Sequence, residues 1–463
     1  MVIRGVPEKL AKDGWWLDDA PPRRIGPAIA IFALVGCADL LSWDIGAGLG
    51  FVVLMLLIAG AAQVMLGRAV TLRRAALAWA VLFVALIPAV DLVQPLSVGF
   101  AVLGLLSFAA LSTVQEWDGA RLMAVALRLP GVGLLQGYRD LRAAHVAPPS
   151  AGQIWELVRD WLMPLVMGAV FLTLLAVANP VLDAWLAEVE LFSGQVDFDG
   201  TRMLFWLLAA LMIWPLLRLT DMAAGLTWPL RGVALPRTGL VNARSVMRAL
   251  LVFNLIFAMQ SLLDLRYLWA GAALPDGMTY AAYAHRGAYP LLVAALMAGG
   301  LAMLAQPFLA GRKHLRILLY IWVAQTILLV ISSILRLDLY IAAYGLTRLR
   351  FAAMIWMVLV ALGLVLMIGQ MIWRQSVGWF MARAAMLGLL TLYGIALVNV
   401  DGVVARHNLA TGKIDRAYLC RLSEGAAPAL RSHGVNCWNV PTISTPRDWR
   451  EWGFRNARLR HSE

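Results

Sequence analysis

Charged side chains are scarce in this chain, and that scarcity excludes a soluble protein. Only 14% of the 463 residues are charged and 61% are apolar, whereas soluble domains carry about 25% charged residues. The net charge of +12 does not indicate a nucleic-acid-binding protein, because no basic stripe with interleaved aromatic residues precedes the C-terminal region. The composition is that of an integral membrane protein.

Sequence signatures of catalysis and of metal binding are also missing. The six histidines show no ligand spacing on a shared helix. Neither a Gly-x-Ser-x-Gly elbow nor a Walker loop is present. We therefore expect no metal site and no cofactor, and the sequence does not favour an enzyme.

Long apolar runs are what the chain has instead, and there are eleven of them. A hydrocarbon core of about 30 Å needs roughly 20 apolar residues per helix, so the sequence predicts an all-α polytopic bundle of about eleven transmembrane helices. The predicted spans are 25–42, 46–66, 75–93, 96–114, 161–183, 201–217, 247–268, 287–308, 315–335, 351–373 and 383–399. The expected organisation is a segment 1–24, a transmembrane domain 25–400 with a helical loop at 115–160, and a small domain 401–463.

The basic residues alternate between the gaps, which predicts the orientation. Gaps on the side of the N-terminus carry 23 of the 39 Lys and Arg residues, the gaps on the other side carry six, and the C-terminal region carries ten. This positive-inside pattern predicts a cytoplasmic N-terminus and loop 115–160. An odd number of spans then places the C-terminal domain in the periplasm, and the location is a bacterial inner membrane.

Five of the six basic residues on the outer side lie between positions 266 and 350, together with tyrosines and carboxylates. Gln260, Asp264 and Tyr267 share one helix face, and an ion pair between Asp264 and Arg336 is expected, because a lone charge inside a span is costly. The candidate ligand-binding residues of this outer layer are Asp264, Arg266, His285, Arg286, Arg336, Asp338, Arg348 and Arg350. The alternative interpretation is ordinary anchoring of helix ends at the membrane interface.

Three function classes remain open on these residues. The first is binding or transport of an anionic small molecule or lipid headgroup through an outward-facing polar cleft. The second is a non-catalytic scaffold or regulatory subunit, with protein partners that the sequence does not identify. The third is an envelope enzyme acting on a lipid-linked substrate, because Asp39 and Asp44 are similar to the external acidic residues of membrane glycosyltransferases.

The chain has only three cysteines. Cys37 lies within the first predicted span and is expected to pack as a small apolar residue. Cys420 and Cys437 both lie in the domain predicted to be periplasmic, where thiols oxidise, and 17 residues separate them. We predict a disulfide between them.

Two motifs carry a family resemblance. They are Leu-Asp-Leu-Arg-Tyr-Leu-Trp at 263–269 with Tyr-Ala-His-Arg-Gly-Ala-Tyr-Pro at 283–290, and Ser-Ser-Ile-Leu-Arg-Leu-Asp-Leu-Tyr at 332–340. Residues 160–430 resemble an uncharacterised family of bacterial polytopic inner-membrane proteins, a domain of unknown function numbered 4173. The resemblance implies a bacterial membrane location and no particular activity.

Overall fold

A computed structural model describes residues 25–66, 71–113, part of 122–135, 200–219, 243–270, 294–309, 311–435, 437, 443 and 445–461. Within these ranges the regular structure is helical and contains no strand. Eight of the described helices are long and apolar enough to cross a membrane, and Ile29–Ser42 and Ala294–Ala305 are shorter apolar helices. The protein is therefore an all-α polytopic helical membrane protein.

The apolar helices, including α2 with its segment Ile29–Ser42, follow the predicted spans closely. They are α2 (Ile25–Ser42), α3 (Leu49–Leu66), α4 (Leu72–Asp91), α5 (Pro95–Thr113), α9 (Gly200–Leu217), α11 (Ala243–Asp264) continued by a π-helical turn η2 (Leu265–Trp269), α13 (Lys313–Tyr344), α14 (Arg348–Ile372) and α15 (Val377–Leu397). With Ala294–Ala305, ten predicted spans overlap a described helix. The span 161–183, the segment 1–24 and most of the loop 115–160 lie outside the described residues.

Short helices make up the C-terminal region, which we call the tail (residues 400–461). They are α16 (Val400–Ala410), α17 (Arg416–Leu419), η4 (Glu424–Ala426), α18 (Ala427–Ser432), η5 (Trp449–Glu451) and α19 (Phe454–His461). The chain divides into two compact units, which we describe separately. Unit 1 comprises Met1–Ile87, Ala101–Leu230 and Trp449–Glu451, and unit 2 comprises Pro88–Phe100, Arg231–Asp448 and Trp452–Glu463.

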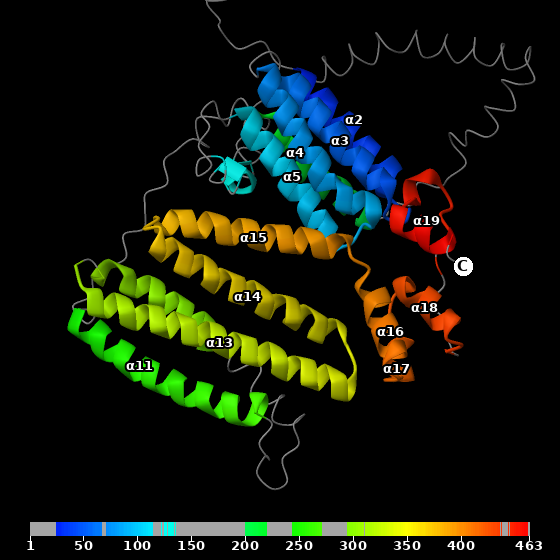
Figure 1. The fold of residues 1–463 in the computed structure, drawn as a ribbon. Coiled ribbons are helices and arrows are strands. Elements are labelled where there is room, and N and C mark those ends of the chain that lie inside the picture. Colours follow the sequence, from blue (N-terminus) through cyan, green and yellow to red (C-terminus); the bar gives the residue numbers. More distant parts are fainter. Residues whose placement is uncertain are drawn as a thin grey trace, which may run out of the picture. The chain divides into compact units, whose positions relative to one another are not determined.

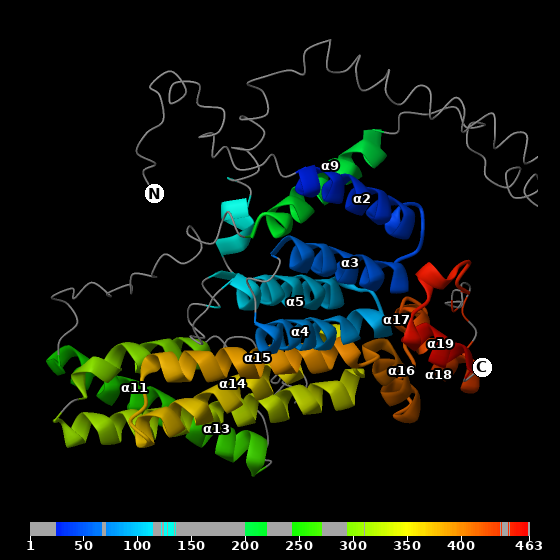
Figure 2. The same ribbon diagram turned by 90° about the horizontal axis from the view of Figure 1, so that it is seen from above.

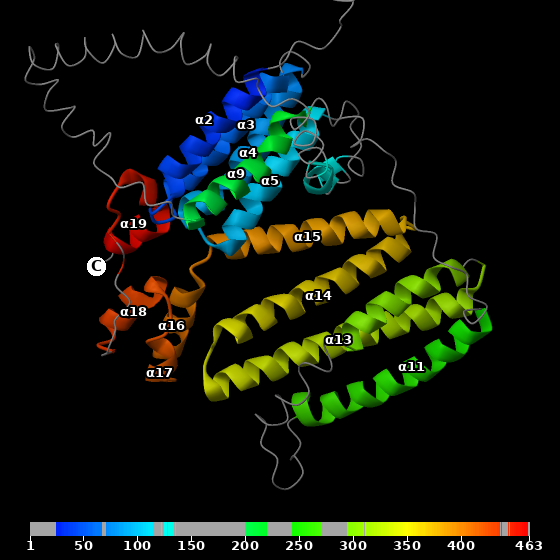
Figure 3. The ribbon, with the colours of Figure 1, turned by 180° about the vertical axis from the view of Figure 1, so that it is seen from behind.

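In unit 1, helices α2, α3 and α9 pack against one another, as Figures 2 and 3 show. The tail helix η5 lies on the turn between α2 and α3, where the backbone N–H of Gly46 donates to Glu451 Oε1 at 3.0 Å. Gly48 faces the backbone of Arg450 and Glu451 so closely that a Cβ atom has no room there. Glycine is therefore required for this close approach.

In unit 2, helices α11, α13, α14 and α15 pack in the order of the chain (Figure 1). Helices α11 and α13 run in the same direction. The Asn254 amide, midway along α11, donates to the Leu318 carbonyl near the start of α13 at 3.0 Å, and farther along both helices Arg336 contacts Asp264. Beside the Asn254 contact, the buried Trp322 ring stacks on Phe253 with centroids 5.1 Å apart. Large apolar and aromatic contacts therefore hold this parallel pair along its length.

The tail of unit 2 has a core that is continuous with the core of the long helices. Val404, Leu419 and Leu430 are fully buried, and their cluster includes Ile341 and Leu346 at the end of α13 and the following loop. Burying a leucine side chain contributes about 1.5–3 kcal/mol. Residues 400–435 thus depend on the transmembrane helices for part of their core.

Candidate functional site

Asp264 and Arg336 form the ion pair that their positions in the sequence predict. The two residues are 1% and 3% exposed, and Arg336 Nη2 donates to Asp264 Oδ1. The Gln260 amide donates to the same oxygen at 2.8 Å. Opposite charges that are buried together compensate part of each other's desolvation, so this contact locks α11 to α13.

Two further residues of the predicted outer layer are exposed. The Arg266 guanidinium lies 5.8 Å from the centre of the Tyr267 ring, which is a weak cation–π arrangement at an exposed site. Asp338 is exposed. His285 and Arg286 lie outside the described residues.

Arg348 belongs to a different contact, between the start of α14 and the tail. Its Nε and Nη2 atoms donate to the two oxygens of Asp401, both at 2.5 Å, and the Ser423 backbone N–H donates to Asp401 Oδ2 at 2.9 Å. Burial raises the pKa of the Asp401 carboxyl, but the hydrogen bonds from Arg348 and Ser423 outweigh burial and hold this pKa below its usual range. The Arg348 backbone N–H also donates to the Tyr418 hydroxyl at 2.8 Å.

Arg350 closes the end of α13. Its Nη1 atom donates to the carbonyls of Tyr344, at 3.1 Å, and of Gly345, and its guanidinium lies 4.3 Å from the centre of the Tyr340 ring. A cation at a helix C-terminus satisfies carbonyls that lack an intrahelical donor.

The structure therefore does not gather the four described arginines into one cleft. Arg266 is exposed beside Tyr267 and Arg336 is buried against Asp264. Arg348 binds Asp401, and Arg350 binds the carbonyls at the end of α13. Their role in ligand binding stays a prediction.

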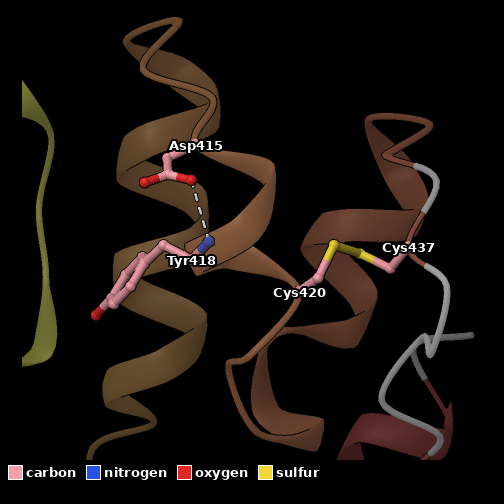
Figure 4. Close-up of a disulfide and its surroundings, with 4 residues drawn as sticks. All are labelled: Asp415, Tyr418, Cys420 and Cys437. Atoms are coloured by element: carbon pink, nitrogen blue, oxygen red, sulfur yellow. Dashed lines mark hydrogen bonds between the residues drawn. A yellow bond between two sulfur atoms is a disulfide. The ribbon is translucent and has the colours of Figure 1, made fainter.

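The predicted disulfide between Cys420 and Cys437 is present, with Cα atoms 5.6 Å apart (Figure 4). Cys420 directly follows the short helix α17, whose N-terminus is capped by Asp415: the Tyr418 backbone N–H donates to Asp415 Oδ1 at 3.1 Å. The bridge therefore fixes the segment from Tyr418 to Ser423. Tyr418 contacts Arg348 at the start of α14, and Ser423 contacts Asp401.

A second buried ion pair, which sequence reasoning missed, joins the hairpin between α4 and α5 to helix α19. Arg455 donates through Nε and Nη2 to Asp91 Oδ2, at 2.8 and 2.5 Å, and these residues are 5% and 8% exposed. The Ala396 carbonyl at the end of α15 accepts from Arg455 Nη2 at 2.8 Å and from the Gln94 amide at 3.0 Å. Asp91 stands out in the sequence as a carboxylate at a helix end, but nothing selects Arg455 among the ten basic residues of the tail.

In unit 1, Asp39 is also engaged. Its oxygens accept hydrogen bonds from Arg202 Nε at 2.9 Å, from Arg202 Nη2 at 2.5 Å and from the Trp206 indole at 2.8 Å. This carboxylate therefore ties α2 to α9, and the geometry does not favour it as the catalytic acid or base that the glycosyltransferase likeness suggests.

A basic pocket of about 900 Å³ opens at the start of α11 and α13, at the opposite end of these helices from Asp264 and Arg336. Its lining consists of four basic residues, Arg244, Arg312, Lys313 and His314, with Ala243, Met247, Gly311 and Leu315. Arg312 is the N-cap residue of α13, and its side chain makes no capping hydrogen bond to this helix N-terminus. The first N–H groups of a helix have no intrahelical acceptor, so they add donors to a pocket that is already cationic. Sequence reasoning treated these cations only as topology signals.

The pocket has the donors for an anion and not for a metal ion. No group of three or more His, Cys, Asp or Glu side chains that could hold a metal lies among the described residues. Arginine offers planar paired donors and lysine a compact positive charge, and both bind phosphate oxygens. A helix N-terminus favours the same ligand class.

Comparison with known proteins gives a family and nothing more specific. Residues 49–433 match a family described as a domain of unknown function, DUF4153. The expectation of an uncharacterised family is confirmed, but the number 4173 expected from the motifs is not the number of this family. No curated protein and no solved structure matches the chain.

Proposed function

The chain belongs to the DUF4153 family, whose function is unknown, and from its geometry we propose that it is a multi-pass membrane protein that binds a phosphate-type anion. The basic pocket at the start of α11 and α13 carries this proposal. It brings Arg244, Arg312, Lys313 and His314 to one cavity, whereas the described arginines of the outer layer do not line a common cavity.

The charge pattern supports the proposed placement of this site. Positive-inside orientation puts the starts of α11 and α13 on the cytoplasmic face of a bacterial inner membrane, with the tail in the periplasm. Basic pockets at the cytoplasmic ends of transmembrane helices attract anionic headgroups and phosphates. Hydrogen bonds to charged groups contribute about 1.5–3 kcal/mol each, so three such contacts correspond to millimolar to micromolar binding before the entropic cost of association is subtracted.

Thermal unfolding of the detergent-solubilised full chain with added pyrophosphate tests the proposal. A ligand that binds only the folded protein raises the melting temperature with its concentration. We expect a saturable increase in wild type, which the double variant Arg244→Gln/Lys313→Gln loses. Arg248→Gln is the matched control, because it removes a cation from the same helix outside the pocket lining. An increase of equal size in all three proteins, or none in wild type, would contradict anion binding in this pocket.

A scaffold function is the second candidate, and the rigidity of the tail favours it. Arg348 with Asp401, Arg455 with Asp91, and the Cys420–Cys437 bridge all hold tail residues of unit 2 in place. A surface fixed in this way is suited to docking a partner without an ordering cost.

A photo-crosslinker at the exposed Ile414 tests this scaffold function. It should give one discrete adduct in intact cells, and Arg348→Gln, which breaks the contact with Asp401, should abolish this adduct. A diffuse set of adducts that is unchanged in this variant would argue against docking.

A further inference from the structure

We infer that the ligand of the basic pocket is a membrane phospholipid, whose phosphate occupies the pocket and whose acyl chains lie along α11 and α13. The inference rests on the proposed function and names the source of the phosphate. The observation behind it is that exposed apolar side chains begin at the lining of the pocket itself.

The apolar surface starts at Met247, which lines the pocket and is 44% exposed. One turn further along α11, Leu251 is 49% exposed. On α13, Ile317 is 55% exposed and lies one turn after the pocket residue Lys313. Side chains four residues apart share a helix face and project back toward the helix N-terminus, so Leu251 and Ile317 extend the apolar side of the pocket.

The spacing suits a lipid that stands upright beside the two helices. One helical turn advances about 5.4 Å, so Ile317 lies about one turn beyond Lys313 and Leu251 about two turns beyond Arg244, where the methylenes of an acyl chain follow a bound headgroup. Farther along, Leu255 and Ile321 continue the exposed surface on each helix. Helices α11 and α13 pack side by side, so both can contact one lipid.

A soluble phosphate makes a different demand on the same pocket. It uses only the cationic lining and gains nothing from Leu251 or Ile317, which lie outside that lining. A phospholipid uses both parts, and its affinity depends on chain length. The two sources of phosphate are therefore separable by experiment.

Native mass spectrometry of the full chain in detergent provides the test. The probes are dioleoyl phosphatidylglycerol and dibutyryl phosphatidylglycerol, which share a headgroup and differ in chain length. We compare wild type, the pocket variant Arg244→Gln/Lys313→Gln, and the chain-contact variant Leu251→Ser/Ile317→Ser. The matched control Leu262→Ser/Leu339→Ser changes exposed apolar residues at the other ends of the same helices.

Wild type is expected to retain the dioleoyl lipid at least tenfold more than the dibutyryl lipid. The chain-contact variant should lose this preference and keep the wild-type stabilisation by pyrophosphate, whereas the control should match wild type in both assays. If the double serine variant does not fold, the single change Leu251→Thr replaces it, with a smaller loss expected.

Two results would overturn the inference, and they differ in what they leave standing. Equal retention of both lipids, with the chain-contact variant unchanged, indicates a soluble anion; the proposed function then survives. No stabilisation by pyrophosphate, together with lipid retention that is the same in the pocket variant, removes both the lipid and the anion site.

Discussion

Asp401 shows how this chain uses its few carboxylates. It lies just after the last long helix and accepts hydrogen bonds from Arg348 and from Ser423. These donors hold its pKa below the usual range although burial acts in the opposite direction. The ionised form is therefore the one that stabilises the contact between α14 and the tail.

The pH dependence of this contact follows from the depressed pKa. Stabilisation by Asp401 is fully present above the unfolded-state pKa of about 3.9 and is lost as the pH falls through the lower folded-state value. Asp401→Asn should lower the melting temperature at pH 7, and its difference from wild type should begin to close below about pH 4. Thermal unfolding of both proteins at pH 7, 5, 4 and 3 measures the difference in melting temperature. A difference that stays constant down to pH 3 would show that ionisation of Asp401 does not stabilise the fold.

The buried pair of Asp264 and Arg336 makes a second residue-scale prediction. Each single change, Asp264→Ala or Arg336→Ala, leaves an isolated buried charge and should cost about 3–5 kcal/mol. The double variant leaves no charge, so its loss should be smaller than the sum of the two. Melting temperatures of the four proteins complete the cycle, and additive losses would show that the pair is not coupled.

Some of these contacts could be predicted from the sequence and others could not, for a physical reason. Asp264 and Arg336 interrupt apolar helices at matching depth, and the cost of a lone charge there requires a partner. Arg348 and Asp91 lie at helix ends, where water is an acceptable alternative partner. Nothing in the local sequence therefore shows that Asp401 binds Arg348 or that Arg455 binds Asp91 in place of water.

At the scale of elements, hydropathy located the helices but not all of their ends. The span 315–335 stops at the first charge, whereas α13 continues to Tyr344. The helix continues because Arg336 is paired, and it stops where Gly345 adopts a φ of +78°, a conformation that glycine accepts without strain. The sequence predicted α2 with the observed bounds, since no charged residue lies within that apolar run until Asp39.

The turn between α2 and α3 depends on a glycine. In unit 1, Gly48→Ala should push the backbone of Arg450 and Glu451 away and lower the melting temperature. Gly36→Ala on α2 is the control, because nothing lies within 4 Å of its added Cβ and alanine favours a helix by about 0.5–1 kcal/mol. Equal melting temperatures for the two variants would mean that the tail does not bind this turn closely.

The disulfide makes an element-scale prediction about the tail. Closing a loop of 17 residues stabilises by about 3 kcal/mol in the chain-entropy description. Cys420→Ser/Cys437→Ser should therefore lower the stability of residues 400–435, measured by limited proteolysis. In intact spheroplasts, a membrane-impermeant thiol reagent should label wild type only after reduction. Labelling that requires lysis would place the tail in the cytoplasm instead.

For the whole molecule, the contacts of unit 2 constrain the number of membrane crossings. Arg455 and Gln94 connect the α4–α5 hairpin to the end of α15, and Arg348 contacts Asp401 just beyond that end. We therefore propose that the hairpin and the α13–α14 loop lie on the same side of the membrane, an arrangement that needs an even number of crossings between them. Five apolar helices are described in this interval: α5, α9, α11, Ala294–Ala305 and α13. The predicted span 161–183 lies outside the described residues and would be the sixth, so the eleven-span topology stays a prediction.

Single cysteines on either side of that span test the count. In a chain whose three native cysteines are serines, Ser193→Cys should react with an impermeant thiol reagent in intact spheroplasts, and Ser150→Cys should react only after lysis. Ile414→Cys in the tail serves as the outer reference. If Ser150→Cys and Ser193→Cys behave alike, the chain does not cross between them and the eleven-span topology is wrong.

The Asp91–Arg455 pair also has a consequence for the order of synthesis. The two residues are 364 positions apart, so at about 5–20 residues per second the ribosome needs roughly 20–70 s to supply the arginine after the aspartate. Until then Asp91 lies at the end of its hairpin without the arginine that binds it in the folded chain. Only a chain synthesised to position 455 can therefore join this hairpin to helix α19, so the contact is among the last that the chain can complete.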